Sequence, residues 1–477
     1  MMLAACLALD ASGARAGAVT EGSGNNVFLV APSSGDLAVP ANAAIASCPS
    51  AGCTVEIAPP TSAATLSGPI IINKSNVTLK CDSPYSMAGT RGFKTSRSPN
   101  GYFYGVVDIG AVNNINVLGC RLDVSAITAP VAAIHVWGST NVKIDGNYIT
   151  STVSGSTDSG ILGIRVEGSS TQPSGKIEIS HNYVTVPWIA YTVGYYGYDV
   201  DIHDNFSYQS GQCFDFNGVS VMGKPPIAGR INFHSNNCTS SYNSGYVESI
   251  VDVIIAHNMF YLDSSEGPTI RVHINGSTFQ VRTLIDSNDF VGSSAQSNAI
   301  HMYQIAQQWQ ISNNIISGYG NDGILIDAEA ATLMYGSITG NQILNVGTSG
   351  ATYCGINLLA NPGHYIYWLA ITNNSFIDVQ KPQTEKYPVC ATGNGAPPIL
   401  NLLYTANMSN LGNPISLPNG CKSCSLYGSI DLAGPTLSTF GELGTTQTPT
   451  ASKTPSDHSI PIVVNGTTYY MRLSTTP

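Results

Sequence analysis

A short motif recurs along the chain, in which an Ile or Phe precedes an Asn by three positions. Most copies place another apolar residue two positions after the Asn, so apolar and polar positions alternate with a period of two. This alternation predicts β-strands rather than helices. Nine copies of the motif form a regular series, 22 to 35 residues apart: Asn147, Asn182, Asn205, Asn236, Asn258, Asn288, Asn314, Asn341 and Asn374. A degenerate copy has Cys120 in place of the Asn.

A second alternating segment precedes each asparagine segment, as in residues 163–167, 213–217, 269–274 and 323–327. Two or three short strands per repeat, joined by loops rich in Gly, Ser and Asn, are what a parallel β-solenoid requires. Each repeat would form one coil, and equivalent positions would stack about 4.8 Å apart. The asparagines are therefore predicted to form a structural column, because one amide can donate to and accept from the next.

The two ends of the chain differ from the repeats. At the start, residues 1–24 predict a truncated signal peptide or a disordered N-terminus. The Ala-rich residues 39–47 predict a short helix that caps the open end of the hydrophobic stack. After the solenoid of residues 25–390, we expect an irregular cap over 391–443 and a linker over 444–458. Residues 459–477, with Asn465-Gly466 at their centre, predict a β-hairpin tail.

Charge limits what such a solenoid can bind. The chain has 19 Lys and Arg against 29 Asp and Glu, a net charge of −10, and charged residues make up only 10% of it. Nucleic acid is not expected as a partner, because no basic patch exists to neutralise phosphates. No apolar run reaches the roughly 18 residues of a membrane span.

The 11 cysteines indicate disulfides and export to an oxidising compartment. Cys48 with Cys53 and Cys421 with Cys424 are the close pairs. The second pair lacks the further ligands of a zinc site, and no dense acidic motif supports calcium. We therefore expect no cofactor, with calcium as the open alternative, and a secreted or extracellular protein or one on a virion surface.

The repeat and the segments that open it resemble the pectin-lyase-like superfamily of right-handed parallel β-helices. The opening segments are residues 52–57, 69–72 and 76–81, and the resemblance covers roughly residues 25–390. It implies an all-β fold, a right-handed single-stranded parallel β-helix of about 10–12 coils with an N-terminal cap helix and a small C-terminal β-hairpin. The hairpin resembles the terminal segments of phage tail-spike and surface-fibre proteins, and we expect it to form a homotrimer.

Specific family motifs are absent from the sequence. Polygalacturonases of this fold carry Asn-Thr-Asp, paired Asp-Asp, Gly-His-Gly and Arg-Ile-Lys, and pectate lyases carry Trp-x-Asp-His and Arg-x-Pro-x-x-Arg; none occurs here. The resemblance therefore implies the position of the groove and the type of chemistry, but not the substrate. In the resembling enzymes, the polysaccharide lies along the outer face of one parallel sheet.

The alternation identifies which side chains point outward from the strand before each asparagine strand. Asp215, Glu248, and Arg271 with His273 are predicted to stand on three consecutive coils, with the register of Glu248 ambiguous by one residue. Two carboxylates one coil apart could serve as acid and base. Arg271 could neutralise a uronate or sulfate, and His273 could move a proton near neutral pH. These four are the candidate catalytic residues.

Other outward residues and a nearby aromatic run are candidates for binding a sugar chain, the aromatic rings by stacking. They are Arg165, Glu167, Trp188, Tyr195, Tyr196, Asn217, His301, Tyr303 and Asp327; the run also includes Tyr191 and Tyr198. His135, Asp108 and Asn357 share the column but look isolated, so we expect them to be structural. Four histidines just before their asparagines are expected to share one turn position rather than to bind ligands. They are His181, His203, His234 and His257.

Two hypotheses for function remain. The first is a secreted polysaccharide lyase or glycoside hydrolase that acts on an acidic or decorated polysaccharide. The second is a non-catalytic glycan-binding adhesin or tail-spike-like protein that uses the same groove, since solenoid faces bind well without chemistry.

Overall fold

The fold was analysed in a computed structural model of the chain. It describes residues 19–21, 26–30, 36–58, 64–81, 87–89, 104–127, 131–152, 160–218, 228–262, 267–273, 282–292, 297–303, 307–328, 332–350, 353–361, 363–392, 399–411, 415–417, 421–422, 424–427, 430–431, 441–442, 459–464 and 467–472. The expected linker and most of the expected N-terminal segment lie outside these residues. No helix within these ranges is long and apolar enough to cross a membrane.

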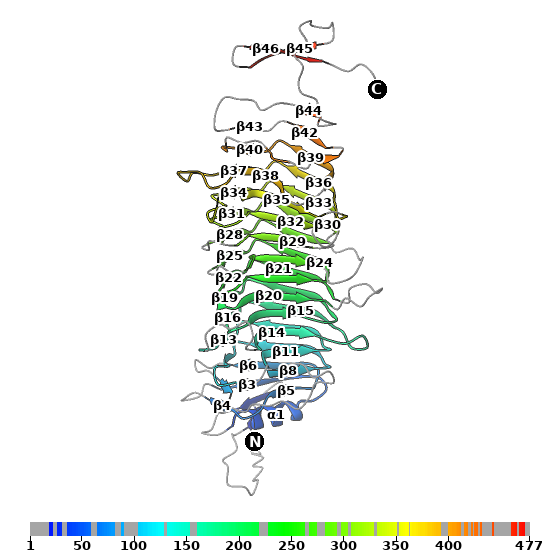
Figure 1. Cartoon of the computed structure of the whole chain (residues 1–477). Helices are drawn as coiled ribbons and strands as arrows, with labels where there is room; N and C mark the ends of the chain where they lie inside the picture. Colours follow the sequence, from blue (N-terminus) through cyan, green and yellow to red (C-terminus); the bar gives the residue numbers. More distant parts are fainter. Residues whose placement is uncertain are drawn as a thin grey trace.

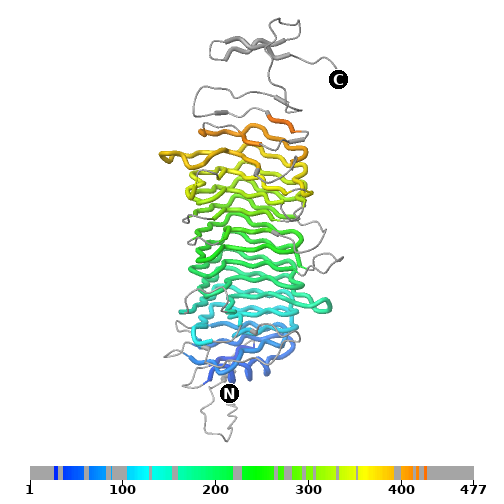
Figure 2. Tube along the Cα trace, in the orientation of Figure 1, coloured from blue at the N-terminus to red at the C-terminus, as the bar shows by residue number. Residues whose placement is uncertain are grey.

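The chain winds as a right-handed parallel β-helix, an elongated stack of coils in which each coil adds one strand to each of three sheets (Figure 1). Figure 2 shows the same stack as a Cα trace, with successive coils following one another from N-terminus to C-terminus. The short apolar alternations build it, because each strand turns its apolar residues inward against the coils above and below. The predicted fold class is confirmed.

Sheet 1 has 12 strands, all parallel. They are β5 (Ile70–Ile72), β8 (Tyr104–Gly110), β11 (Val131–Trp137), β14 (Ile161–Glu167), β17 (Ile189–Val193), β20 (Gln212–Asn217), β23 (Gly245–Glu248), β26 (Ile270–His273), β29 (Ile300–Tyr303), β32 (Ile324–Ala328), β35 (Cys354–Ala360) and β38 (Tyr387–Thr392).

Sheet 2 has 18 strands, of which the pairs β1–β2 and β42–β44 are antiparallel. They are β1 (Val19–Glu21), β2 (Val27–Val30), β3 (Cys53–Ile57), β6 (Val77–Cys81), β9 (Asn113–Leu118), β12 (Thr140–Asp145), β15 (Ser174–Ser180), β18 (Gly197–His203), β21 (Gly229–His234), β24 (Val251–Ala256), β27 (Thr283–Asp286), β30 (Gln307–Ser312), β33 (Leu333–Thr339), β36 (Ile366–Thr372), β39 (Ile399–Thr405), β41 (Cys421–Lys422), β42 (Ser425–Tyr427) and β44 (Gly441–Glu442).

Sheet 3 has 14 parallel strands. They are β4 (Ala64–Leu66), β7 (Met87–Gly89), β10 (Arg121–Asp123), β13 (Tyr148–Thr150), β16 (Tyr183–Thr185), β19 (Phe206–Ser210), β22 (Asn237–Ser240), β25 (Met259–Leu262), β28 (Asp289–Gly292), β31 (Ile315–Ser317), β34 (Gln342–Leu344), β37 (Ser375–Ile377), β40 (Met408–Ser409) and β43 (Ile430–Asp431).

One helix, α1 (Ala38–Ser47), lies at the N-terminal end of the stack (Figure 1). It buries Ala41, Ala44 and Ile45. A row of open strand edges at the end of a solenoid invites pairing with other chains, and a helix across that end blocks it. At the other terminus, β45 (Ser459–Val464) and β46 (Thr467–Arg472) pair antiparallel, as the hairpin pattern predicts.

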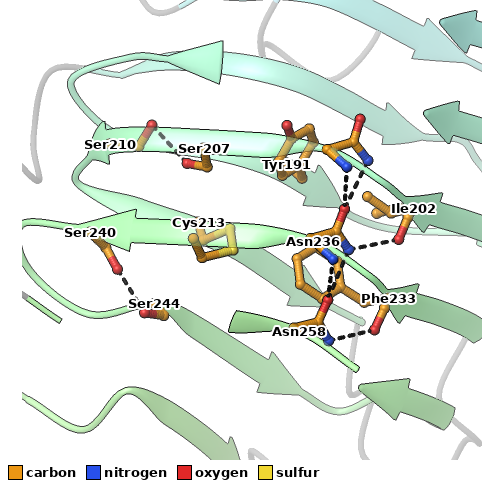
Figure 3. The surroundings of a disulfide bond; sticks show 12 residues. Tyr191, Ile202, Ser207, Ser210, Cys213, Phe233, Asn236, Ser240, Ser244 and Asn258 are labelled. Atoms are coloured by element: carbon orange, nitrogen blue, oxygen red, sulfur yellow. Dashed lines mark hydrogen bonds between the residues drawn. A yellow bond between two sulfur atoms is a disulfide. The ribbon is translucent and has the colours of Figure 1, made fainter. Parts of the chain in front are cut away.

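The asparagines form a buried column where sheet 2 turns into sheet 3. Asn236 shows the repeating pattern: its Nδ2 donates to Ile202 O at 2.9 Å and to Asn258 Oδ1 at 3.1 Å (Figure 3). Its backbone N donates to the same Asn258 Oδ1 at 2.9 Å. The predicted structural column is confirmed, and each member satisfies polar groups of both neighbouring coils.

The coils continue beyond residue 390, where we expected an irregular cap. Strands β39 and β40 complete a further coil, and Asn407 joins the column by accepting from the Asn374 backbone N at 2.9 Å. The motif search missed this copy because Tyr404, rather than Ile or Phe, stands three positions before Asn407. A Tyr fits at this position, since Tyr404 is buried in the core like its apolar counterparts.

Disulfides cross-link the cap helix to the first coil and join segments of the stack. The expected Cys48–Cys53 bond is present. Three more bonds join Cys81 to Cys120, Cys213 to Cys238, and Cys354 to Cys390. Cys424 is also disulfide-bonded, whereas the side chain of its expected partner Cys421 lies outside the described residues. Such bonds are typical of exported proteins.

Candidate functional site

The strand register sorts the outward side chains of sheet 1 into two columns along the helix axis. The first column includes Asp108, His135, Arg165, Thr192, Asp215, Tyr246, Arg271, His301 and Leu325. The second includes Trp137, Glu167, Asn217, Glu248, His273, Tyr303 and Asp327. Polar residues occupy most of both columns, in a chain where only 10% of residues are charged.

Asp215 and Glu248 stand on neighbouring strands, β20 and β23. Asp215 pairs with Tyr246 in the register, and Glu248 pairs with Asn217. This settles the register of Glu248: it points outward, two residues along the strand from the position opposite Asp215. Asn217 Nδ2 donates to Glu248 Oε2 at 3.1 Å. Both carboxylates are half-buried, which keeps them within reach of a ligand on this face.

Arg271 lies on the next strand, β26, opposite Tyr246 and His301. Its guanidinium carbon is 4.6 Å from the centre of the Tyr303 ring. Within the described ranges of the chain, its Nε is buried without a hydrogen-bond partner, and no carboxylate pairs with it. The guanidinium is thus held by an aromatic face, which leaves its positive charge uncompensated by an anion of the described residues.

His301 and Asp327 form a pair one and two coils beyond Arg271. His301 Nε2 is 3.0 Å from Asp327 Oδ2, and the imidazole packs 5.5 Å from the Tyr303 ring. His273 is opposite Glu248 and Tyr303 in the register, but its side chain lies outside the described residues. The sheet therefore brings Asp215, Asn217, Glu248, Arg271, His301, Tyr303 and Asp327 onto one wall. We call these seven residues the sheet 1 cluster.

A separate, buried network lies nearer the N-terminus on the same sheet. His135 joins two acids: its Nδ1 is 2.8 Å from Asp108 Oδ1, and its Nε2 is 3.0 Å from Glu167 Oε1. Arg165 binds the other oxygen of Glu167 through Nε at 2.9 Å and through a terminal nitrogen at 2.6 Å. His135, Arg165 and Glu167 are only 5%, 8% and 7% exposed. The expectation that His135 and Asp108 are isolated is wrong.

The network fixes the charges of its members. Burial by itself would raise the pKa of Glu167, but the hydrogen bond from His135 and the charge of Arg165 outweigh it and lower the pKa to about 2. Burial would likewise lower the pKa of His135, but its bonds to Asp108 and Glu167 prevail and raise it. The positive charges of His135 and Arg165 then balance the negative charges of Asp108 and Glu167. Buried charges require such pairing. Arg165 and Glu167 bind each other, which distinguishes them from the more open sheet 1 cluster.

The buried network predicts how stability varies with pH. Because the folded-state pKa of His135 is raised above its ordinary 6.5, its contribution is complete below that pH and declines as the pH rises through the folded value. The Glu167 contribution is present above its ordinary 4.5 and declines as the pH falls through about 2. The free energy of unfolding, measured with urea, should therefore fall as the pH rises through the folded-state pKa of His135. The His135→Gln variant should lack this fall; an identical decline in the variant would refute the assignment.

The structure does not gather the predicted aromatic residues into one surface. Trp188 precedes β17 and packs against a small apolar cluster of Ala132, Leu162 and Ile189. Tyr195 and Tyr196 follow β17, about 20 Å farther along the chain. Tyr191, included in the same run, points inward and is fully buried, because it alternates with the outward Thr192. Tyr198 lies on sheet 2.

Two further expectations need correction. Asn357 is not isolated: its Nδ2 donates to Asp322 Oδ2 at 3.0 Å, and burial raises the pKa of Asp322 to about 6. The four turn histidines occupy two positions rather than one. His181 and His257 directly precede their asparagines with positive φ, whereas His203 and His234 end strands β18 and β21 and stack 5.1 Å apart.

Sequence reasoning missed the partnership of His135 with Asp108 and Glu167. A signal was present, since alternation also places His135 on the outer face, one coil before Arg165. It was overlooked because residues one coil apart are separated by 27 and 32 positions in the chain. Within the described ranges, no group of three or more His, Cys, Asp or Glu is arranged to hold a metal ion.

Hollows occur on the outer face of sheet 2. Two adjoining troughs of about 430 and 650 Å³ lie over sheet 2. Both are lined by Asn114, Asn141, Lys176 and Asp199. The outer surface of sheet 2 therefore contains hollows large enough for a small ligand.

Comparison with known proteins supports the fold. No protein-family model and no curated protein matches the chain. Among solved structures, the catalytic unit of a GH87 α-1,3-glucanase from Streptomyces thermodiastaticus strain HF3-3 is 14% identical, with a TM-score of 0.54, over 83% of this chain and 67% of that one. The Azotobacter vinelandii mannuronan C-5 epimerase AlgE6 A-module is 13% identical, with a TM-score of 0.47, over 83% and 95%. The Dettilon tailspike protein is 14% identical, with a TM-score of 0.48, over 81% and 68%. At these identities the likeness concerns the parallel β-helix alone.

Proposed function

We propose that the protein is an exported enzyme that cleaves an acidic polysaccharide lying along the outer face of sheet 1. One observation carries the proposal: Arg271 has no carboxylate partner among the described residues, yet it stands on the same wall as Glu248 and Asp215, one and two coils away. A uronate or sulfate of the substrate would supply the missing anion. The α-1,3-glucanase structure that shares the fold is consistent with a sugar polymer as ligand.

Each of the four candidate catalytic residues has a separate role in the proposed reaction. Asp215 and Glu248 act as the acid–base pair, with Asn217 orienting Glu248 through its 3.1 Å hydrogen bond. Arg271 neutralises the anionic group of the sugar, and His273, opposite Glu248 in the register, moves a proton near neutral pH. His301, Tyr303 and Asp327 extend the binding wall beyond Arg271. Trp188, Tyr195 and Tyr196, at the two ends of β17, are proposed to meet the polymer at the edges of the sheet. Arg165 and Glu167 position the wall from within the buried network.

Two reactions fit these roles. In β-elimination, a base removes the proton beside the uronate carboxyl, the bond from the adjacent carbon to the glycosidic oxygen breaks, and an acid protonates that oxygen. The products are an unsaturated uronate and a new reducing end. In hydrolysis, the acid protonates the glycosidic oxygen while the base activates a water, and both product chains are saturated. Ultraviolet absorption of the unsaturated product distinguishes elimination from hydrolysis.

The Arg271→Gln variant tests the proposal. On the acidic polymer that the wild type cleaves, we expect kcat/KM to fall about 10- to 100-fold, the effect of losing a charge-assisted hydrogen bond. Reducing-end and ultraviolet assays over uronate-containing, sulfated and neutral polymers provide the measurement. Arg230→Gln is the matched control, because Arg230 lies on sheet 2 and already pairs with Asp199 at 2.6 Å. An unchanged kcat/KM for Arg271→Gln would end the assignment.

The same panel tests the adhesin alternative. A paired C-terminal hairpin, β45–β46, favours that alternative, since an isolated hairpin is marginal in water and gains stability by self-association. A trimer by light scattering that binds acidic polymers without releasing any product would establish the adhesin. A protein that releases product would establish the enzyme, whatever its oligomeric state.

A further inference from the structure

The outer face of sheet 2 changes character along the helix axis. Near the N-terminal end it carries paired charges, such as Lys143 Nζ and Glu178 Oε1 at 2.8 Å. Toward the C-terminal end, strands β30, β33, β36 and β39 contain no Asp, Glu, Lys or Arg. On this uncharged part, Tyr335 and Trp368 are 49% and 47% exposed. Large aromatic side chains with this much exposure are uncommon and mark interaction sites when they cluster.

The exposed rings form an ordered group. The Tyr335 and Trp368 rings are parallel within 1°, with centroids 4.9 Å apart. Tyr367 packs 5.4 Å from Trp368, and Tyr365 packs 5.4 Å from Tyr367. A separation of 4.9 Å between parallel rings fits the offset-stacked arrangement, in which part of each face stays uncovered. We call Tyr335, Tyr367 and Trp368 the aromatic platform.

The backbone beneath the platform is the second observation. Tyr335 and Trp368 have φ of 54° and 51°, in the left-handed region. Most coils of sheet 2 have a left-handed residue at this register position, and the other occupants are polar residues: Asn76, Asn114, Asn141, Lys176, Asp199, Arg230, Asp252, Gln308 and Asn401. Asn and Asp tolerate this conformation, whereas bulky aromatic residues are unfavourable in it. The fold therefore gives no reason for a Tyr and a Trp here, and backbone strain of this kind clusters at functional sites.

We propose that the aromatic platform is a second carbohydrate-binding site, which stacks the hexose rings of a neutral sugar chain. The apolar C–H face of a hexose packs on an aromatic ring in the same way as other apolar groups. Gln308 and Asn401 precede and follow Tyr335 and Trp368 at the same register position, and Gln310 lies two residues along β30 from Gln308. These uncharged side chains can bind hydroxyl groups. An anionic sugar is disfavoured, because the four strands offer no cation. This site goes beyond the proposed cleavage on sheet 1 and does not depend on it.

A second ladder of rings provides a matched comparison. On sheet 3, Tyr148 and Tyr183 stack at 4.6 Å with 13° between their planes, and Tyr148 is 37% exposed. Here the guanidinium of Arg121 lies 5.2 Å over the Tyr148 ring, and neither tyrosine has positive φ. Tyr148 and Tyr183 thus show that aromatic rings on neighbouring coils can stack from ordinary strand positions, without backbone strain. Tyr148 is accordingly the control for the platform residues.

The test replaces Tyr335 and Trp368, the two platform residues with positive φ, with Asn, the residue that best tolerates the left-handed backbone. Binding is measured by affinity electrophoresis and calorimetry with dextran, a soluble β-1,3-glucan and a galactomannan, and with alginate as the acidic polymer. The wild type is expected to bind at least one neutral polymer. Tyr335→Asn and Trp368→Asn should each weaken that binding about tenfold. Their melting temperatures should equal or exceed that of the wild type, because Asn relieves the strain, while Tyr148→Asn should keep full affinity.

Three outcomes would overturn the proposal that the aromatic platform binds a neutral sugar chain. The first is unchanged affinity in both Asn variants, and the second is a wild type that binds none of the neutral polymers. The third is a wild type whose mass in light scattering exceeds that of the variants, which would make a second copy of the chain the occupant of this face. The Arg271→Gln variant should keep its affinity for the neutral polymer. The platform and the cleavage site can therefore fail independently.

Discussion

The Glu248→Gln variant is expected to lower kcat on the acidic polysaccharide by about 10²- to 10⁴-fold, the usual contribution of a positioned acid or base. The substitution preserves the size of the side chain and the acceptor for Asn217, whose Nδ2 is 3.1 Å from Glu248 Oε2. It removes the negative charge and the ability to exchange a proton. Reducing-end release under substrate saturation measures kcat, and KM should change little because the contacts to the sugar remain.

The control for this variant is Glu178→Gln on sheet 2. Glu178 also lies at a half-buried, outward position, where it pairs with Lys143 at 2.8 Å. Its replacement should leave kcat at the wild-type value, since it faces away from the sheet 1 cluster. The kcat of the Asp215→Asn variant should fall as far as that of the Glu248→Gln variant. If both sheet 1 variants turn over at the wild-type rate, the acid–base pair is elsewhere.

The largest expected effect on stability is at the asparagine column. Asn236→Ala should lower the free energy of unfolding by about 3–5 kcal/mol. Asn236 Oδ1 accepts from the backbone N and the Nδ2 of Asn205, both at 3.0 Å. Its Nδ2 donates to Ile202 O and Asn258 Oδ1 (Figure 3). The alanine leaves the buried Asn205 N–H without its acceptor and removes a donor from the buried Ile202 carbonyl.

Urea unfolding of Asn236→Ala and of Asn232→Ala provides the comparison. Asn232 lies four residues earlier on the outer face of sheet 2, where its Nδ2 donates to Asp201 at 3.1 Å. Because water can replace that bond, the Asn232 variant should lose less than about 1 kcal/mol. Equal losses in the two variants would contradict a buried, self-satisfying column. Asn236→Asp should be destabilised as well, since a carboxylate offers no donor to Asn258.

Much of the fold follows from residues that are close in sequence. The apolar residue three positions before each asparagine, such as Phe233 before Asn236, sets both the inward side chain and the buried turn of one coil. Alternation also determined that Asp215 and Arg271 point outward, whereas the direction of Glu248 was settled by the pairing of β20 with β23. Both conclusions hold because a strand turns successive side chains to opposite faces, whatever the rest of the chain does. The extra coil at Asn407 was missed only because the search required Ile or Phe where Tyr404 stands.

Tertiary structure decided which outward residues meet. His135 belongs with Asp108 and Glu167, and Arg271 rests on Tyr303, because of the register between coils. Register depends on how each loop closes its coil, and the loops vary in length from one coil to the next. Burial was equally hidden from the sequence: Arg165 and Arg271 share a column, yet one is enclosed with Glu167 and the other lacks a carboxylate partner among the described residues. The chain thus determined by itself the direction of each side chain, a local property of a strand. The contacts of each side chain and its exposure to solvent were decided only when coils distant in sequence stacked on one another.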